Sequence, residues 1–153
     1  MRWLCSGRCE SGFTLIELLV VMLILGVLAA IAIPAFLSQK EKADDSKAKV
    51  EVRTMATAIE TCRTENEDGD YDGCDGDRLM AIEPTIPAAA EVLESAGNTY
   101  EVESAPAEST GNLFRIKRED GEITRSCEIG AAGKAGGCNT AADDPVPGAD
   151  GTW

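Results

Sequence analysis

Histidine is missing from all 153 residues of the sequence. Its absence excludes Ser-His-Asp and Cys-His catalysis and any metal site built on imidazole. Basic residues are also scarce, because 14 Lys and Arg stand against 27 Asp and Glu, which leaves a formal net charge of −13. Binding to a phosphate backbone needs clustered Lys and Arg, so we expect no nucleic-acid partner. A Gly-rich phosphate loop and a nucleophile elbow are absent too, and we predict that the protein is not an enzyme.

Apolar residues are concentrated in one run near the start of the chain. Residues 13–37 read FTLIELLVVMLILGVLAAIAIPAFL and carry a single charge, Glu17. A helix of this length rises about 37 Å, which exceeds the ~30 Å hydrocarbon core of a bilayer. Its length and its lack of a polar face argue against a buried core helix. The run is also longer than the apolar core of a secretory signal peptide, so we expect it to remain on the mature protein as a transmembrane helix.

Glu17 is the unusual residue of this run. A carboxylate inside a membrane helix costs up to a few kcal/mol and is a functional-site hypothesis by default. The alternative is a protonated or snorkelling acid near the interface. If cleavage freed the amine of Phe13, a positive charge would lie one helical turn from Glu17. That amine could pair with Glu17 of its own chain or of a neighbouring helix.

The residues Gly12-Phe13-Thr14-Leu15-Ile16-Glu17, followed by the apolar run, resemble the class III signal of type IV pilins and pseudopilins. The resemblance implies that a prepilin peptidase removes residues 1–12 by cutting between Gly12 and Phe13, and that the same enzyme family N-methylates Phe13. It implies further that Glu17 neutralises the terminal amine of an adjacent subunit during assembly. Pro34 lies where pilin helices bend or locally melt in the filament, and proline weakens a helix on physical grounds.

The resemblance also implies partners and a location. We expect a single-pass protein of the cytoplasmic membrane with an extracytoplasmic C-terminal head, which becomes part of a cell-surface pilus after assembly. Its expected partners are other pilin subunits, in a homopolymer or a mixed filament, the prepilin peptidase and methyltransferase, and the inner-membrane assembly machinery.

After Leu37 the pattern becomes amphipathic. Over residues 38–62, apolar side chains recur at spacings of three and four, which places them on one face of a helix that continues into the head. These residues are Ala48, Val52, Met55, Ala56, Ile59 and Cys62.

The rest of the head predicts a small sheet. We divide it into an acidic loop with a short helix (63–97, the helix over 87–95), an antiparallel meander (98–138) and an extended tail (139–153). Alternation over 98–103 predicts one strand, and Asp120-Gly121 is a hairpin signal between two more, 112–118 and 122–127. The expected fold is α+β, a long N-terminal helix packed on a small antiparallel sheet, as in pilins. Parts of the head also resemble small pilin-like proteins of actinobacterial type, through 82–85, the hairpin, 136–138 and the ending Gly-Thr-Trp.

Four of the six cysteines, Cys62, Cys74, Cys127 and Cys138, lie outside the leader. An even number in an exported head predicts two disulfides, with three possible connectivities. We favour the local pairs Cys62–Cys74 and Cys127–Cys138, each worth roughly 3 kcal/mol by the chain-entropy relation. Free thiols are the alternative, and zinc is excluded because no C-x-x-C is present.

The segment 65–77 holds seven acids in thirteen positions without a base. Asp68, Asp70 and Asp72 match the start of an EF-hand loop, but Leu79 occupies the twelfth position, where a bidentate Glu is required. Calcium is therefore the one cofactor that the sequence suggests, and a solvated acidic turn is the simpler interpretation.

Three functions follow from these observations. The first is a structural subunit of a type IV pilus, polymerised through its N-terminal helix. The second is a pseudopilin of a type II secretion or DNA-uptake system, with the same processing. The third, from another class, is an uncleaved single-pass membrane anchor that carries a binding module.

Overall fold

The computed structural model describes residues 13–140 and 148–153. The leader, with Gly12, lies outside the described residues. The elements in chain order are α1 (Leu15–Glu65), α2 (Gly76–Ile82), β1 (Glu91–Ala96), β2 (Thr99–Glu103), β3 (Leu113–Glu119), β4 (Glu122–Glu128), β5 (Asn139–Thr140) and β6 (Asp150–Thr152). The chain divides into two compact units between Leu37 and Ser38, and each is described by itself.

Helix α1 has different surroundings in the two units. Every residue from 15 to 40 is exposed. In the second unit, one face of α1 is buried at spacings of three and four, as the amphipathic pattern predicts. Its buried residues are Asp45, Ala48, Val52, Met55, Ala58, Ile59 and Cys62. The helix continues through Pro34 and ends three residues later than the predicted end at Cys62.

One antiparallel sheet of six strands, in the order β1-β2-β3-β4-β6-β5, forms the rest of the head. Strands β2, β3 and β4 are the predicted meander. The β3–β4 hairpin turns at Asp120 and Gly121, whose φ angles of 51° and 83° are both left-handed. Such a pair matches the right-handed twist of the flanking strands and is favoured by Asp-Gly.

The short helix predicted over 87–95 is wrong. Residues 91–96 form strand β1, which pairs with β2 from Glu91↔Glu103 to Ala96↔Thr99. The connection is the two-residue turn Gly97-Asn98, in which Gly97 has a φ of 55°. Glycine is typical of a helix end, but a Gly-Asn pair between two strand partners is also a hairpin signal. The actual short helix, α2, lies earlier and is capped by Asp75, whose side chain accepts a hydrogen bond from the backbone N–H of Arg78.

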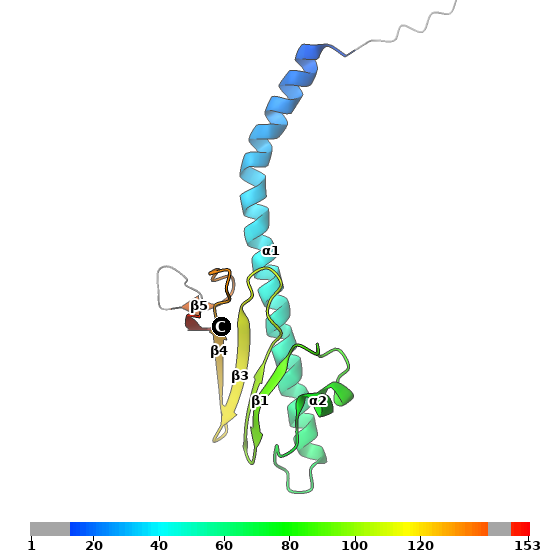
Figure 1. Ribbon diagram of the computed structural model, residues 1–153, viewed down its shortest axis with the longest axis vertical. Coiled ribbons are helices and arrows are strands. Elements are labelled where there is room, and N and C mark those ends of the chain that lie inside the picture. The colour runs from blue at the N-terminus through cyan, green and yellow to red at the C-terminus, as the bar shows by residue number, and fades with distance from the viewer. Residues whose placement is uncertain (1–12, 141–147) are drawn as a thin grey trace, which may run out of the picture. The chain divides into compact units, whose positions relative to one another are not determined.

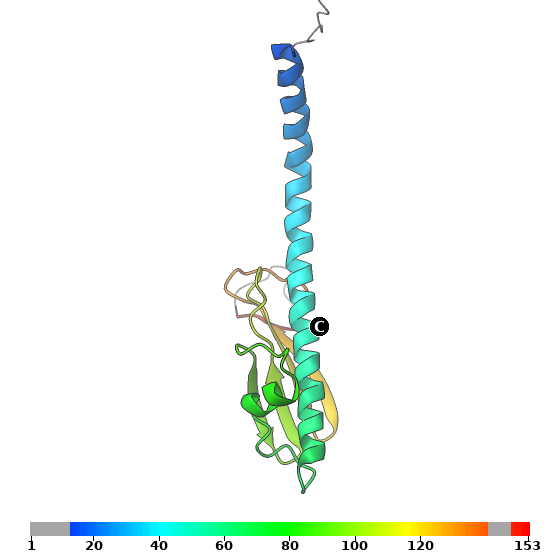
Figure 2. The same ribbon diagram turned by 90° about the vertical axis from the view of Figure 1, so that its right-hand side faces the viewer.

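The core lies between α1 and the sheet in residues 38–153. Figures 1 and 2 show the C-terminal half of α1 along one face of the sheet, with α2 beside it. Register places Phe114 opposite Cys127 and Ile116 opposite Val102, so these side chains share the face that is turned toward the helix. The expected α+β architecture, a long helix packed on an antiparallel sheet, is confirmed.

The predicted extended tail in fact adds two strands to the sheet. Cys127 is paired with Gly151 between β4 and β6, and Thr140 with Gly151 between β5 and β6. Trp153 docks on the head, where its indole N–H donates a 2.8 Å hydrogen bond to the Ser126 carbonyl. Its ring meets Phe114 edge-on at a centroid distance of 5.8 Å.

Candidate functional site

The N-terminal part of α1 presents an uncovered apolar surface. Leu15 is 82% exposed and Ile31 is 73% exposed, although both are large aliphatic residues. By length and composition, this helix can cross a membrane. Single exposed apolar residues are ordinary, but a contiguous apolar surface this large needs lipid or other protein to cover it. The segment is therefore the candidate assembly surface.

At the start of this helix lies Thr14, which the sequence analysis did not single out. Its hydroxyl accepts a 3.2 Å hydrogen bond from the backbone N–H of Glu17, which makes Thr14 the N-cap of α1. Thr-x-x-Glu is the capping-box spacing, and this signal was available in the sequence. Glu17 occupies the first turn of the helix, where the helix dipole favours a negative charge. Phe13 is 78% exposed beside it.

Both predicted disulfides are present in the structure. Cys62–Cys74 joins the end of α1 to the acidic loop, with a Cα–Cα distance of 5.9 Å. Cys127–Cys138 joins β4 to the segment that leads into β5, with a Cα–Cα distance of 5.8 Å. The favoured local pairing is confirmed, and each bond fastens an irregular segment to a regular one.

The acidic loop, residues 65–77, does not form the EF-hand-like ligand set that its first acids suggested. A carboxylate oxygen of Asp70 accepts hydrogen bonds from the backbone N–H of Asp72 and the side-chain amide of Asn66, so it supports the turn itself. A carboxylate oxygen of Asp72 accepts a 2.7 Å hydrogen bond from the Gly97 N–H. Over the described ranges, no three Asp, Glu or Cys side chains gather into a group able to hold a metal ion. Calcium binding itself stays an untested prediction.

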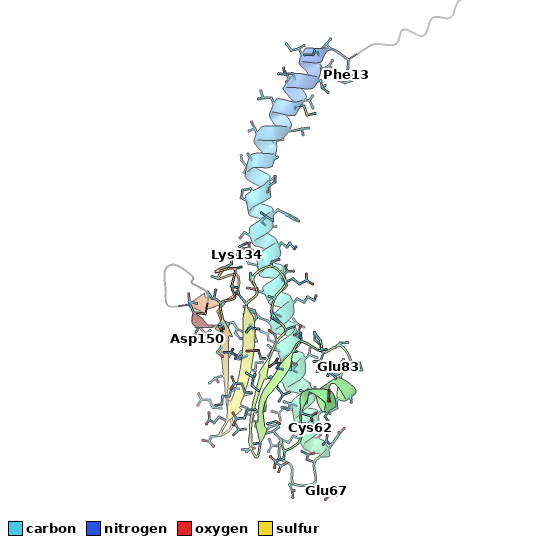
Figure 3. All side chains as sticks on the ribbon, viewed as in Figure 1. Phe13, Cys62, Glu67, Glu83, Lys134 and Asp150 are labelled. Carbon is cyan, nitrogen blue, oxygen red and sulfur yellow. A yellow bond between two sulfur atoms is a disulfide. The ribbon has the colours of Figure 1, made fainter. Side chains whose placement is uncertain are left out.

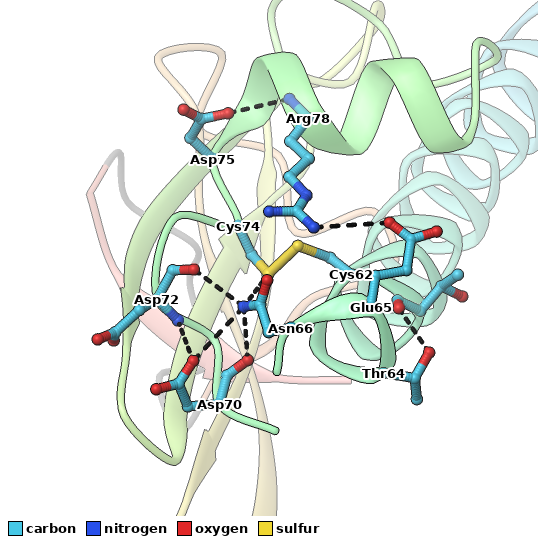
Figure 4. A network of polar contacts seen from close by, with 10 residues as sticks. Cys62, Thr64, Glu65, Asn66, Asp70, Asp72, Cys74, Asp75 and Arg78 are labelled. Carbon is cyan, nitrogen blue, oxygen red and sulfur yellow. Dashed lines mark hydrogen bonds and ion pairs between the residues drawn. A yellow bond between two sulfur atoms is a disulfide. The ribbon is translucent and has the colours of Figure 1, made fainter. Parts of the chain in front are cut away.

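Hydrogen bonds connect residues within this loop, as Figure 4 shows. The side-chain amide of Asn66 donates 3.0 Å hydrogen bonds to the carbonyls of both Asp70 and Asp72. Within the loop, the side chain of Tyr71 is fully buried. The acidic loop is therefore fastened by its own hydrogen bonds and by the buried ring of Tyr71.

A buried acid that the sequence analysis missed fastens the loops of the head to α1. Asp45 is fully buried. Its carboxylate accepts hydrogen bonds from the Gly137 N–H at 2.6 Å, the Asn112 amide at 3.0 Å and the Thr110 hydroxyl. The sequence did contain a signal for the burial of Asp45, because it lies three residues before Ala48 on the buried stripe. The charged residues around it, however, are typical of a solvated face.

Two tyrosines pack against each other beneath the sheet. Tyr71 and Tyr100 meet edge-on at a centroid distance of 4.9 Å. The Tyr71 hydroxyl donates a 3.0 Å hydrogen bond to Glu60, which also forms an ion pair with Arg118. Burial, with a smaller contribution from the charge of Glu60, raises the pKa of Tyr100 to about 12.

The fold and the site define a class of protein: an α+β head, stabilised by disulfides, and an apolar helix that no described residue of the chain covers. Comparison with known proteins agrees. The family model described as the prokaryotic N-terminal methylation motif matches residues 7–33. No match to a solved structure was found.

Curated relatives extend the match into the head. The type II secretion system core protein G of Vibrio cholerae is 32% identical over 138 residues, 89% of this chain and 90% of the relative. The type IV major fimbrial protein FimA of Dichelobacter nodosus is 36% identical over 112 residues, 68% of this chain and 69% of the relative. The chain belongs to the type IV pilin and pseudopilin family.

Proposed function

We propose that this protein is a structural subunit of a type IV filament, and not an enzyme, and that it polymerises through the N-terminal part of α1. The observation that carries the proposal is the uncovered apolar surface of residues 13–37, with Glu17 as its one charge. Before assembly, lipid covers this surface. In the filament, the same surface of other subunits replaces the lipid.

Processing prepares the helix for this exchange. A prepilin peptidase cuts between Gly12 and Phe13 on the cytoplasmic side, and the new amine of Phe13 receives a methyl group and stays positively charged. Positively charged residues of the leader are thereby lost, while a single cation remains at the start of the helix. The head is extracytoplasmic, which fits its two disulfides because such bonds persist in oxidising compartments.

Glu17 then directs the packing. An ionised carboxylate at the centre of a bilayer costs about 2.5–3.5 kcal/mol by insertion scales, and a paired one costs less. Pairing with the Phe13 amine of a neighbouring subunit removes that cost only when the two helices adopt one axial register. The pair therefore selects the register, while apolar contact supplies most of the affinity. Pro34, which lacks a backbone N–H, is the place where α1 would bend in the filament.

The mass of the mature N-terminus tests the processing step. We expect a chain that begins at methylated Phe13 in membranes or filaments. An intact Met1 start would defeat this function and would favour an uncleaved membrane anchor that carries a binding head.

Glu17→Gln tests the assembly step, because it keeps the shape of the side chain and removes its charge. We expect normal membrane insertion and at least a tenfold loss of filaments, counted by electron microscopy and by sheared-fraction immunoblot. Glu91→Gln is the matched control, since Glu91 is an exposed acid on β1. Normal filaments from Glu17→Gln would refute the pairing role.

A pseudopilin is the second candidate, favoured by the alignment with protein G of V. cholerae over nearly the whole chain. Deletion of the gene separates the two candidates. Loss of long surface fibres indicates a pilus, whereas intact fibres with a loss of protein secretion or DNA uptake indicate a pseudopilus.

A further inference from the structure

The head carries a small basic surface, although the chain as a whole is strongly acidic. Arg53 of α1 and Arg125 of β4 both lie over the indole of Trp153, with guanidinium carbons 5.0 and 5.8 Å from the ring centroid. Ile123, on the same face of β4, is 47% exposed. We call these four residues the arginine–tryptophan patch.

The two arginines of the patch lack a carboxylate partner within the described ranges. All other arginines there, except Arg63, form ion pairs with Glu residues: Arg78, Arg115 and Arg118. Arg63 instead donates hydrogen bonds to the Gly69 carbonyl and the Tyr71 hydroxyl. Arg53 and Arg125 are both exposed. In a chain with 27 acids and 14 bases, two adjacent arginines without an acid are available to a partner's carboxylates.

The acidic loop, residues 65–77, carries the complementary charge. Glu67, Asp68 and Asp77 are exposed, and no described residue donates a hydrogen bond to their side chains or forms an ion pair with them. Because the Cys62–Cys74 disulfide and the Asn66 hydrogen bonds already hold the loop, its ordering adds little entropic cost to binding.

The loop and the patch of one chain do not meet. Figure 3 shows Glu67 beyond Cys62, at one end of the head, and among the described residues no hydrogen bond or ion pair joins the acidic loop to Arg53 or Arg125. Arg53 precedes Glu65 by twelve helical residues, a rise of about 18 Å. A contact between loop and patch therefore joins two copies of the chain, staggered along α1.

We propose that the acidic loop of one subunit docks on the arginine–tryptophan patch of another subunit in the same filament. The inference rests on the proposed function, since filament subunits share one orientation. The contact uses different surfaces on its two sides, so it leaves a free loop and a free patch at the ends of every assembly. Such heterologous contacts generate open helical arrays. The contact also offsets the mutual repulsion of strongly acidic heads.

Cysteine cross-linking in the full-length protein tests the geometry. A chain with both Asp68→Cys and Arg125→Cys, oxidised in intact cells that assemble filaments, should give a ladder of dimers, trimers and longer species on a non-reducing gel. Chains with one of the two substitutions are the controls and should give no ladder. The matched pair Glu91→Cys with Arg125→Cys should also give none. Filaments with no ladder, or cross-linking that stops at the dimer, would overturn the contact.

Exchange of charges between the two surfaces tests whether the loop–patch contact is electrostatic. Arg53→Glu with Arg125→Glu should lower filament yield about tenfold, and so should Glu67→Lys with Asp68→Lys, since like charges then face each other. All four substitutions together should restore at least half of the wild-type yield. Lys40→Glu with Lys42→Glu is the matched control and should leave the yield within twofold. Failure of the combined variant to recover, with both pairs individually impaired, would assign the effect to folding or to another partner and would overturn the proposal.

The outcomes distinguish the two proposals. Wild-type filaments without the ladder refute the loop–patch contact and leave the filament function intact. A ladder in cells that form no filaments refutes the filament function and shows that the heads still associate in an open array.

Discussion

The buried carboxylate of Asp45 on α1 accepts a 2.6 Å hydrogen bond from the backbone N–H of Gly137, 92 residues later in the chain. The Lys49 ammonium, one turn further along α1, donates a 2.6 Å hydrogen bond to the carbonyl of the same glycine. Helix α1 thus holds the peptide groups on both sides of Gly137. The segment that leads into the second disulfide is fastened at its N-terminal side by these two residues.

Asp45→Ala should destabilise the head by about 3 kcal/mol, because it removes the acceptor of the Gly137 N–H and of the buried Thr110 hydroxyl. Asp45→Asn should cost less, since one acceptor oxygen remains. Denaturant unfolding followed by tryptophan fluorescence measures both. Ser46→Ala, an exposed neighbour, should change the free energy of unfolding by less than about 0.5 kcal/mol. Wild-type stability in Asp45→Ala would contradict the role of this carboxylate.

Gly130→Ala should impair folding. A Cβ atom at this position would lie 2.3 Å from the carbonyl carbon and oxygen of Gly111, both backbone atoms that cannot rotate away. We expect a loss of at least about 2 kcal/mol, as for overpacked core positions. Gly76→Ala is the control, because a Cβ there meets nothing within 4 Å. Equal thermal midpoints for the two variants would contradict the close approach.

The two tyrosines predict a loss of stability at alkaline pH. Since the pKa of Tyr100 is raised to about 12 in the folded state, the unfolded state releases this proton first, near pH 10. The contribution of Tyr100 to stability is then constant below about pH 10 and falls by about 2–3 kcal/mol as pH rises toward 12. Burial also raises the pKa of Tyr71.

The chain has only these two tyrosines, so tyrosinate absorbance near 295 nm reports the pair directly. At pH 10 we expect less tyrosinate in the folded protein than in the unfolded protein, because the pKa values of both tyrosines are raised. Tyr100→Phe should remove the high-pH step of the titration, and half-ionisation of the wild type at pH 10 would refute the buried environment.

Removal of the Cys127–Cys138 disulfide by Cys127→Ser with Cys138→Ser should cost about 3 kcal/mol, because the bond closes a loop of about a dozen residues. Cys62→Ser with Cys74→Ser should cost a similar amount and should also loosen the acidic loop. Under non-reducing conditions, peptide mass mapping should recover the two local links. A peptide joined through Cys62 and Cys127 would contradict the structure.

Much of the protein could be predicted from local patterns. The apolar run, Glu17 within it and the disulfide pairs each depend on residues that are close in the sequence, as does the Asp120-Gly121 turn. The buried stripe of α1 was predictable for the same reason, since its spacing directly reflects the helical repeat.

Other features could not be predicted in this way. Residues 91–96 suit a helix by composition but pair with β2. The hydrogen bonds from that neighbouring strand stabilise the extended conformation, and local helix propensity does not include them. Strands β5 and β6 are too short to show an alternating pattern. They form because β6 pairs with the edge strand β4, and β5 then pairs with β6. The partners of Asp45 lie 65 to 92 residues away.

The apolar helix, the N-terminal methylation motif and the disulfide-bonded α+β head follow from the sequence alone, because short-range periodicity and spacing encode each of them. The burial of Asp45, the lack of a carboxylate beside Arg53 and Arg125, and the separation of the acidic loop from the arginine–tryptophan patch became known from the folded head. Those properties depend on which distant residues come together, and packing of the sheet against α1 brings them together.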